Sequence, residues 1–217
     1  MDPTDKQVKA VELFKEGKRL AIEAGAGTGK TATLIYIAQS TKKSGQYIAF
    51  NRAIVDEASK KMPNNVVCNT AHSLAYRAVG HKFKDRLNQP RIPSHITAKL
   101  LGLEPFYVKD ANQDKRFSPE WLAGHVLKSV SRFCNSADPQ PLLKHVPRIE
   151  SIDFPDVTGK RTYTWNNKLA KHIMPAVGKA WKDFQKQDGQ LRFSPDHYLK
   201  ICQLNKPKIH MVMPPIY

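Results

Sequence analysis

Apolar positions in the first third of the chain alternate between two spacings. Short apolar runs typical of strands occur at residues 20–22, 47–50 and 66–68. Between them lie segments whose apolar residues recur with helical spacing. Three short strands alternating with helices predict a parallel sheet that helices cover on both faces, so the fold class is expected to be α/β.

Local signals mark where two of these helices begin and end. Thr4 followed by Gln7 has the spacing of a capping box, and Gly17 closes the helix predicted for residues 3–16. Thr70 is placed to cap the next helix after the third strand, and Gly80 follows that helix. The carboxyl ends of parallel strands meet at one edge, so the residues that follow each strand should line a single rim.

The alternation stops at about residue 88, after which helical stripes dominate. Residues 88–93 carry two prolines and read as a linker, and Ser94 is predicted to cap a short helix. Ser118-Pro119-Glu120 and Ser194-Pro195 are strong helix starts. The two longest stripes comprise Leu122, Val126, Val130 and Phe133, and then Leu169, Ile173, Val177, Trp181 and Phe184. A loop or small hairpin is expected around Thr158-Gly159.

These patterns divide the chain into three parts. Residues 1–88 form the first part of an α/β domain, and residues 89–205 form a mainly helical insertion. Residues 206–217 are expected to return toward the same sheet, and the tail from Ile209 to Tyr217 is extended and apolar.

A glycine-rich loop lies between the first strand and its helix. It consists of Ala24, Gly25, Ala26, Gly27, Thr28, Gly29, Lys30 and Thr31. Its backbone N–H groups and the positive end of the following helix can bind the phosphates of a nucleotide. Lys30 would contact the β- and γ-phosphates, and the Thr31 hydroxyl would bind magnesium. ATP and magnesium are therefore the expected cofactors.

Charge changes the expected partner more than the expected fold. The 217 residues carry a formal charge of +16 with a pI near 9.8, and the excess is spread evenly along the chain. A polyanion such as nucleic acid is the expected partner. We expect no membrane span and no secretion signal. The three cysteines are too far apart for metal-ligand pairs, so no zinc site or disulfide framework is indicated.

The order of these motifs resembles the first half of the ATPase core of UvrD-like superfamily 1 DNA helicases. Gln7 matches the adenine-reading glutamine of that family, and residues 24–31 match its motif I. Phe50-Asn51-Arg52 is similar to motif Ia. Thr70-Ala71-His72-Ser73-Leu74-Ala75 is similar to a later motif, with Ala71 in place of the usual aromatic residue. Residues 133–138, 145–147 and 196–204 look most like the F-box DNA helicase branch, although no F-box is present.

The resemblance implies a RecA-like P-loop NTPase sheet with an inserted helical subdomain, and an ATP-dependent DNA helicase acting in repair or recombination. Single-stranded DNA, or a junction of single and double strands, would be the partner. The residues expected to contact it are Phe50, Asn51, Arg52, Thr70, His72 and Ser73. Such a protein would be nuclear in a eukaryote, or cytoplasmic and associated with the nucleoid in a bacterium.

The family's Asp-Glu motif and its second RecA-like domain are expected beyond Tyr217, in cis. These parts supply the magnesium-binding aspartate, the water-activating glutamate and an arginine finger. The 217 residues alone are therefore expected to lack DNA-stimulated ATPase activity.

Several alternatives stay open at this point. The loop is also compatible with a P-loop phosphotransferase for a small metabolite, and the charge with a non-catalytic nucleic-acid-binding module. Gln7 has a second possible role as a capping side chain, and His72 as an ordinary residue of a helix's first turn. Trp121 and Trp181 fall on or beside helical stripes, which favours core packing over base stacking.

Overall fold

The computed structural model describes residues 2–110, 113–153 and 163–208. The chain is mixed α/β and divides into two compact units between Leu74 and Ala75. We call residues 2–74 the N-terminal unit and residues 75–207 the helical unit. The boundaries predicted at residues 88/89 and 205/206 remain predictions. The segments expected around Thr158-Gly159 and at 209–217 lie outside the described residues.

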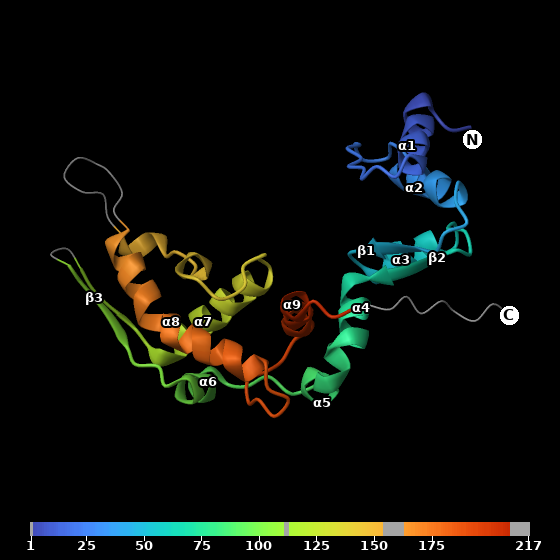
Figure 1. The fold of residues 1–217 in the computed structure, drawn as a ribbon. Coiled ribbons are helices and arrows are strands. Elements are labelled where there is room, and N and C mark those ends of the chain that lie inside the picture. Colours follow the sequence, from blue (N-terminus) through green and yellow to red (C-terminus); the bar gives the residue numbers. More distant parts are fainter. Residues whose placement is uncertain (1, 111–112, 154–162, 209–217) are drawn as a thin grey trace, which may run out of the picture. The chain divides into compact units, whose positions relative to one another are not determined.

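The N-terminal unit contains two helices followed by a parallel strand pair (Figure 1). Its elements are α1 (Asp5–Lys15), α2 (Lys30–Gln39), β1 (Gly45–Ala49), α3 (Arg52–Ser59) and β2 (Val66–Thr70), with α4 (Ala71–Ala78) continuing into the helical unit. Strands β1 and β2 pair in parallel from Gly45 opposite Val66 to Ala49 opposite Thr70. α3 forms the crossover between them and buries Val55 and Ala58.

Most of the predicted boundaries of this unit are confirmed. Gln7 completes the predicted capping box, because its Oε1 accepts the Thr4 N–H at 2.9 Å. Gly17 follows α1 with a φ of +80°, a left-handed conformation that glycine adopts without strain. The strand predicted at residues 20–22 is wrong. Ile22 is 38% exposed, and in the described chain β1 and β2 pair only with each other. Without a neighbouring strand to supply ladder hydrogen bonds, a three-residue apolar run does not become a strand.

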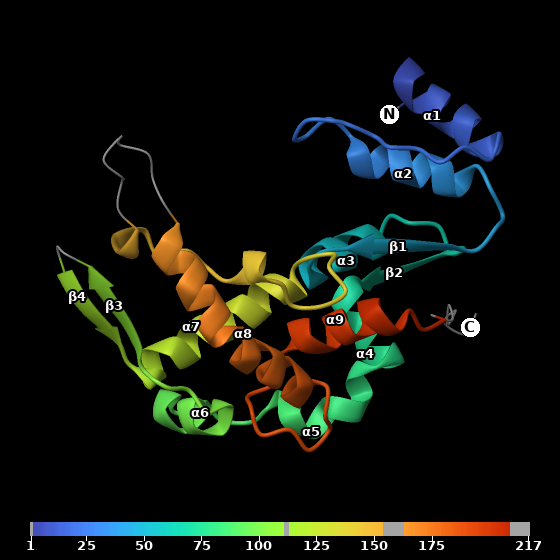
Figure 2. The same cartoon turned by 60° about the vertical axis from the view of Figure 1, so that its left-hand side comes forward.

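The helical unit is built on α7 and α8, which pack against each other (Figure 2). Its elements are η1 (Gly80–Phe83), α5 (Lys84–Leu87), α6 (Ser94–Leu101), β3 (Phe106–Asp110), β4 (Gln113–Phe117), α7 (Pro119–Cys134), η2 (Leu143–His145), η3 (Glu150–Ile152), α8 (Thr164–Phe184) and α9 (Pro195–Asn205). Both predicted stripes are buried: Leu122, Val126 and Val130 on α7 have no exposed area, and neither do Leu169, Ile173 and Val177 on α8.

Helix starts in this unit follow the sequence closely. Ser118 caps α7 by accepting the Trp121 N–H, and Pro119 occupies the first helical position as expected. Ser194 and Pro195 also stand at the cap and first helical positions of α9, where the Ser194 N–H donates to His197 Nδ1 at 3.0 Å. Ser94 is the first residue of α6 and not its cap, because Pro93 takes the cap position.

The antiparallel hairpin of β3 and β4 was not predicted. Phe106 pairs with Phe117 and Val108 with Lys115, and the inward-facing Phe106, Val108 and Phe117 join the core. The aromatic and β-branched run Phe106-Tyr107-Val108 is a strand signal in the sequence. That run is short, and its partner strand Gln113–Phe117 is mostly polar. The two strands therefore lack the clear alternation of apolar and polar residues that would have predicted a hairpin.

Arg86 is the largest fully buried side chain and joins distant parts of the helical unit. Its guanidinium donates to the backbone carbonyls of Asp183, Lys186 and Leu191 and pairs with the Asp183 carboxylate at 3.1 Å. The buried charge is therefore both paired and hydrogen-bonded, as a desolvated cation requires. Arg86 thereby ties α5 to the C-terminal end of α8.

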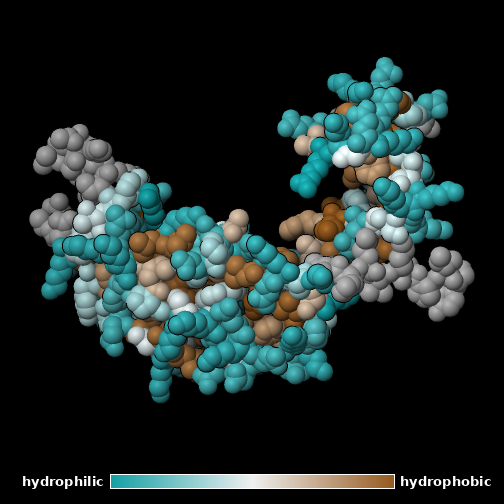
Figure 3. Space-filling model, viewed as in Figure 1, coloured by the Kyte–Doolittle hydropathy of each residue, from teal (hydrophilic) through white to brown (hydrophobic). Residues whose placement is uncertain are grey.

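Hydrophilic and hydrophobic residues are both visible on the helical unit in Figure 3, and hydrophobic residues are also visible around β1. Several large apolar side chains of the N-terminal unit are indeed exposed, namely Val8, Ile22, Leu34, Ile48, Phe50 and Ile54.

Candidate functional site

The glycine-rich loop leads directly into α2. Gly27 and Gly29 adopt φ values of +74° and +81°, where any other L-residue would be strained. α2 begins at Lys30 with Gly29 at the cap position, and no side chain among the described residues caps this end of the helix. The first backbone N–H groups of α2 are thus left for an anion, and the positive end of the helix dipole favours one.

Lys30 lies over the loop that precedes it. Its Nζ donates to the carbonyl oxygens of Ala24, at 2.9 Å, and Gly25. The ammonium is exposed with its loop, and Thr31 is exposed in the first turn of α2. These residues fit a nucleotide's phosphates and their magnesium ion, provided that the ammonium exchanges the two carbonyls for phosphate oxygens.

Gln7 is brought beside the loop by the packing of α1 on α2. Its Nε2 donates to the Thr33 hydroxyl at 3.2 Å, and a Cβ at Gly29 would lie 3.2 Å from the same nitrogen. Its Oε1 serves the capping box, so the structure confirms the capping role. Each amide atom retains one further hydrogen-bonding position, which is what reading an adenine edge requires. That second role stays a prediction.

The second group of predicted residues follows the carboxyl ends of β1 and β2. Because Ala49 lies opposite Thr70, residues 50–52 and 71–73 leave the same edge of the strand pair. Asn51 caps α3, accepting the Ile54 N–H with its Oδ1 at 2.9 Å. Thr70 and Ser73 cap each other's backbone, each hydroxyl accepting the other residue's N–H. The sequence indicated the Thr70 cap but missed the capping role of Asn51.

Phe50 is the most exposed large apolar side chain at this edge, at 86%. An aromatic ring in water with this exposure contributes little to packing, yet either face of it can stack on a base. Arg52 is also exposed and pairs with Asp56 on the next turn of α3 at 2.9 Å. Such a surface ion pair is weak, so the guanidinium can turn to a phosphate at small cost. We call Phe50, Asn51, Arg52, Thr70, His72 and Ser73 the strand-edge site.

Other residue types that could carry chemistry do not form a centre in the part of the chain that the structure describes. Burial raises the pKa of all three cysteine thiols, that of Cys134 to about 12, so none is a thiolate at neutral pH. Within the described residues no group of His, Cys, Asp and Glu could hold a metal ion. No described helix is long and apolar enough to cross a bilayer.

The three tryptophans differ in burial, and the helical stripes predicted only part of this difference. Trp181 is buried in the core as expected. Trp121 is 43% exposed, which corrects its assignment to the core: it lies at the first turn of α7 and packs its ring on Phe117 and His125. Trp165 is partly buried against the core.

Comparison with known proteins relates the chain to DNA helicases. It is 28% identical over 204 residues to F-box DNA helicase 1 of Gallus gallus, covering 90% of this chain and 19% of that protein. It is 29% identical over 209 residues to F-box DNA helicase protein 1 of Schizosaccharomyces pombe, covering 93% of this chain and 22% of that protein. The chain therefore spans about a fifth of the length of these relatives. No family profile and no solved structure matches it.

Proposed function

We propose that this chain is the ATP-binding and single-stranded-DNA-binding portion of an ATP-dependent DNA helicase or translocase, with a P-loop NTPase domain of UvrD-like type. The similarity to two F-box DNA helicases supports a helicase-related function. The loop before α2 supports nucleotide binding. A net charge of +16 supports a polyanionic partner.

The observation that carries the proposal is the strand-edge site. Phe50 stands exposed at the end of β1, and the parallel register places it at the same edge as Thr70. In our proposal Phe50 stacks on a base, while Arg52 and the hydroxyls of Thr70 and Ser73 contact the phosphate backbone. None of these groups reads a base edge, so binding should have little sequence preference.

Each part of the nucleotide would be held by a different group of this chain. The uncapped N–H groups of α2 and the Lys30 ammonium would hold the β- and γ-phosphates, and Thr31 would hold magnesium. When bound, ATP would supply the γ-phosphoryl group whose transfer to water drives translocation, and magnesium would offset the charge of the phosphates. Gln7 would orient the adenine by donating and accepting at its edge.

The test is titration of a fluorescent single-stranded oligonucleotide with the chain and with Phe50→Ala at several salt concentrations. Loss of one stacked base costs about 1–3 kcal/mol, so the variant should bind about 5- to 150-fold more weakly. Its salt dependence should match that of the parent, because no phosphate contact is removed.

Tyr107→Ala is the matched control, since Tyr107 is an aromatic residue of similar size on β3 and is 51% exposed. It should bind like the parent chain. Binding that is independent of salt, or equal losses in both variants, would contradict the proposal and would favour a small-molecule phosphotransferase.

A further inference from the structure

A second cluster of cations surrounds a cleft in the helical unit. The cleft has a volume of about 780 Å³ and is lined by α7, by the segment at residues 143–148 and by α8. Its charged lining residues are Arg132, Lys144, Arg148 and Lys171, and no carboxylate lines it within the described chain. We call this cavity the basic cleft.

The positive charge of the basic cleft is mostly unbalanced. Lys144 pairs with Asp138 at 2.8 Å, whereas no described carboxylate forms an ion pair with Arg132, Arg148 or Lys171. The Arg148 guanidinium lies 4.0 Å from the centre of the Tyr163 ring. This cation–π contact orients the guanidinium but does not neutralise its charge. Like charges gathered around one cleft repel each other and oppose folding, so their placement calls for a reason other than stability.

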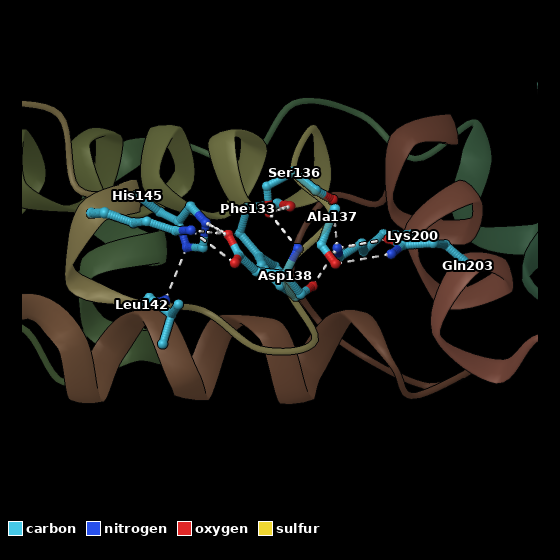
Figure 4. Close-up of polar contacts among 9 residues, drawn as sticks. Phe133, Ser136, Ala137, Asp138, Leu142, His145, Lys200 and Gln203 are labelled. Atoms are coloured by element: carbon cyan, nitrogen blue, oxygen red, sulfur yellow. Dashed lines mark hydrogen bonds and ion pairs between the residues drawn. The ribbon is translucent and has the colours of Figure 1, made fainter.

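The segment at residues 143–148 carries two of these cations, includes the short helix η2, and is held in place by hydrogen bonds to neighbouring elements. In Figure 4, Asp138 lies between His145 and Lys200. Its carboxylate accepts a hydrogen bond from His145 Nε2 at 2.8 Å, while His145 Nδ1 accepts the Leu142 N–H. Lys200 is 1% exposed and donates to the backbone carbonyls of Ser136 and Asp138 and to Gln203.

Two more contacts fix the far end of the same segment. His125 on α7 bonds the Pro147 carbonyl at 2.8 Å, and Asn166 on α8 bonds both the N–H and the carbonyl of Ile149. Burial lowers the pKa of His125, and the charges of Lys128 and Arg132 lower it further, in keeping with a positive potential on this side of α7. The cations of the basic cleft are thus presented by a rigid frame, which reduces the entropy lost on binding an anion.

The arrangement suits an extended polyanion better than a single small anion. The four cations come from three separate segments and line an open cleft, whereas a single phosphate is usually held by groups that converge on one point. Phosphodiester backbones offer one negative charge per nucleotide at regular spacing, and dispersed Lys and Arg side chains bind them by releasing counterions.

We propose that the basic cleft binds the phosphodiester backbone of the nucleic acid, as a second site separate from the strand-edge site. This inference rests on the proposed function, since it assigns that function a further contact surface. Arg132, Arg148 and Lys171 contact backbone phosphates there, and Lys144 adds a charge that Asp138 partly offsets.

The experiment compares two double variants of the full chain that remove equal charge. Arg132→Gln with Lys171→Gln removes two cleft cations that lack a described ion pair. Lys99→Gln with Arg116→Gln removes two exposed cations of α6 and β4 that do not line the cleft. Each is titrated with a single-stranded oligonucleotide and with a duplex of equal length at several salt concentrations.

The cleft variant should lower the magnitude of the log-log salt slope by about 1.4 on single strands, or by about 1.8 on the duplex, because each lost phosphate contact removes about 0.7 or 0.9. Whichever substrate shows this loss is the one that the cleft binds. The control pair should change the slope much less. Thermal unfolding should be unchanged or shifted upward in the cleft variant, since repulsion is relieved, and Lys171→Gln alone should give half the slope change.

Equal slope changes in the two pairs, or no change in the cleft variant on either substrate, would overturn the inference while leaving the proposed function intact. Lack of salt-dependent binding by the parent would overturn both. Inorganic phosphate at constant ionic strength should not displace the oligonucleotide. Displacement from the parent but not from the cleft variant would indicate a small-anion site and would also overturn the inference.

Discussion

At the residue scale, the helical unit relies on a few buried cationic side chains whose terminal nitrogens are hydrogen-bonded, although the Nε of Arg86 has no partner among the described residues. Lys200 donates all three of its hydrogens within 2.8 Å, and Arg86 binds three carbonyls and a carboxylate. Gly189 lies against this second group, where a Cβ would come within 2.3 Å of the Asp183 carbonyl. Such residues tolerate little change, because losing one partner leaves a buried charge uncompensated.

His197 is a buried histidine that contributes to the acid sensitivity of the helical unit. Its ring stacks on Phe184 with centroids 3.8 Å apart, and its Nδ1 accepts the Ser194 N–H at 3.0 Å. Burial lowers its pKa to about 4, with Asp196, Arg86 and Asp183 as the neighbouring charges. The unfolded chain binds a proton near pH 6.5 and the folded chain only near pH 4, so stability is present above pH 6.5 and is lost as the pH falls through this window.

We therefore predict that His197→Gln weakens this loss. The amide can still accept the Ser194 N–H, because Ser-x-x-Gln is a capping-box sequence, but it does not titrate. Urea unfolding at pH 7 and pH 4.5 should show that the parent loses up to about 3 kcal/mol more than the variant between these values. An identical loss in both proteins would mean that His197 is not the group responsible.

At the element scale, α1, α3 and α7 start at short local signals: Thr4, Asn51 and Ser118 stand at their cap positions, each with a capping interaction. The cap position of α2 is Gly29, and no side chain of the described residues caps this helix, as is also the case for α6. What distinguishes α2 is the glycine-rich loop before it and the exposed Lys30 at its first helical position. Its N-terminal N–H groups can therefore be capped by an anion.

Lys30→Ala tests this interpretation of α2. The substitution removes the charge from the loop but leaves the backbone N–H groups and the two left-handed glycines in place. Calorimetry should show ATP binding with magnesium weakened at least about tenfold, since a charge-assisted hydrogen bond contributes about 1.5–3 kcal/mol. Circular dichroism should be unchanged because Lys30 is exposed.

Lys42→Ala provides the matched control for this measurement, as Lys42 is an exposed lysine of the same unit outside the loop. It should bind ATP like the parent. Equal affinity in the Lys30 variant and the parent would mean that the loop is a structural turn.

At the scale of the whole molecule, the two units differ in how much apolar surface they bury. The helical unit has a continuous core that reaches from Ala75 to Cys202. In the described part of the N-terminal unit the buried apolar side chains are Val55, Ala58 and Leu74. A cavity of about 340 Å³ there is lined by apolar residues of α1, α2 and the strands, including Phe14, Leu34 and Tyr47. Burial supplies most of the stabilisation, so the N-terminal unit should be the less stable one.

Hydrogen exchange should display this difference directly. Amides of α1 and α2 should exchange much faster than those of α7 and α8. ATP with magnesium should slow exchange in α2, because a ligand that binds only the folded unit stabilises it by mass action. Exchange in α2 as slow as in α7, without ligand, would contradict this account.

The local pattern of the sequence determined most of the helices of this protein. Caps such as Ser118 and stripes such as that of α8 act within one or two turns, so their effect can be read without knowing the fold. The sequence also predicted β1 and β2 and the edge that Phe50 shares with Thr70, because strands joined by a helical crossover pair in parallel. The change at about residue 88, from alternating strand and helix spacing to mainly helical spacing, is likewise visible in the local pattern of apolar residues.

The tertiary structure alone decided the pairing of β3 with β4, the lack of a strand at residues 20–22, and which charges meet. Residues 20–22 have the composition of a strand but pair with no described strand, whereas β4 has little strand character and pairs with β3. Arg132, Arg148 and Lys171 are unremarkable in sequence and surround one cleft only because α7, α8 and the segment between them are folded together. Pairing and charge clustering depend on contacts between residues far apart in the chain, and the spacing of neighbouring residues carries no record of them.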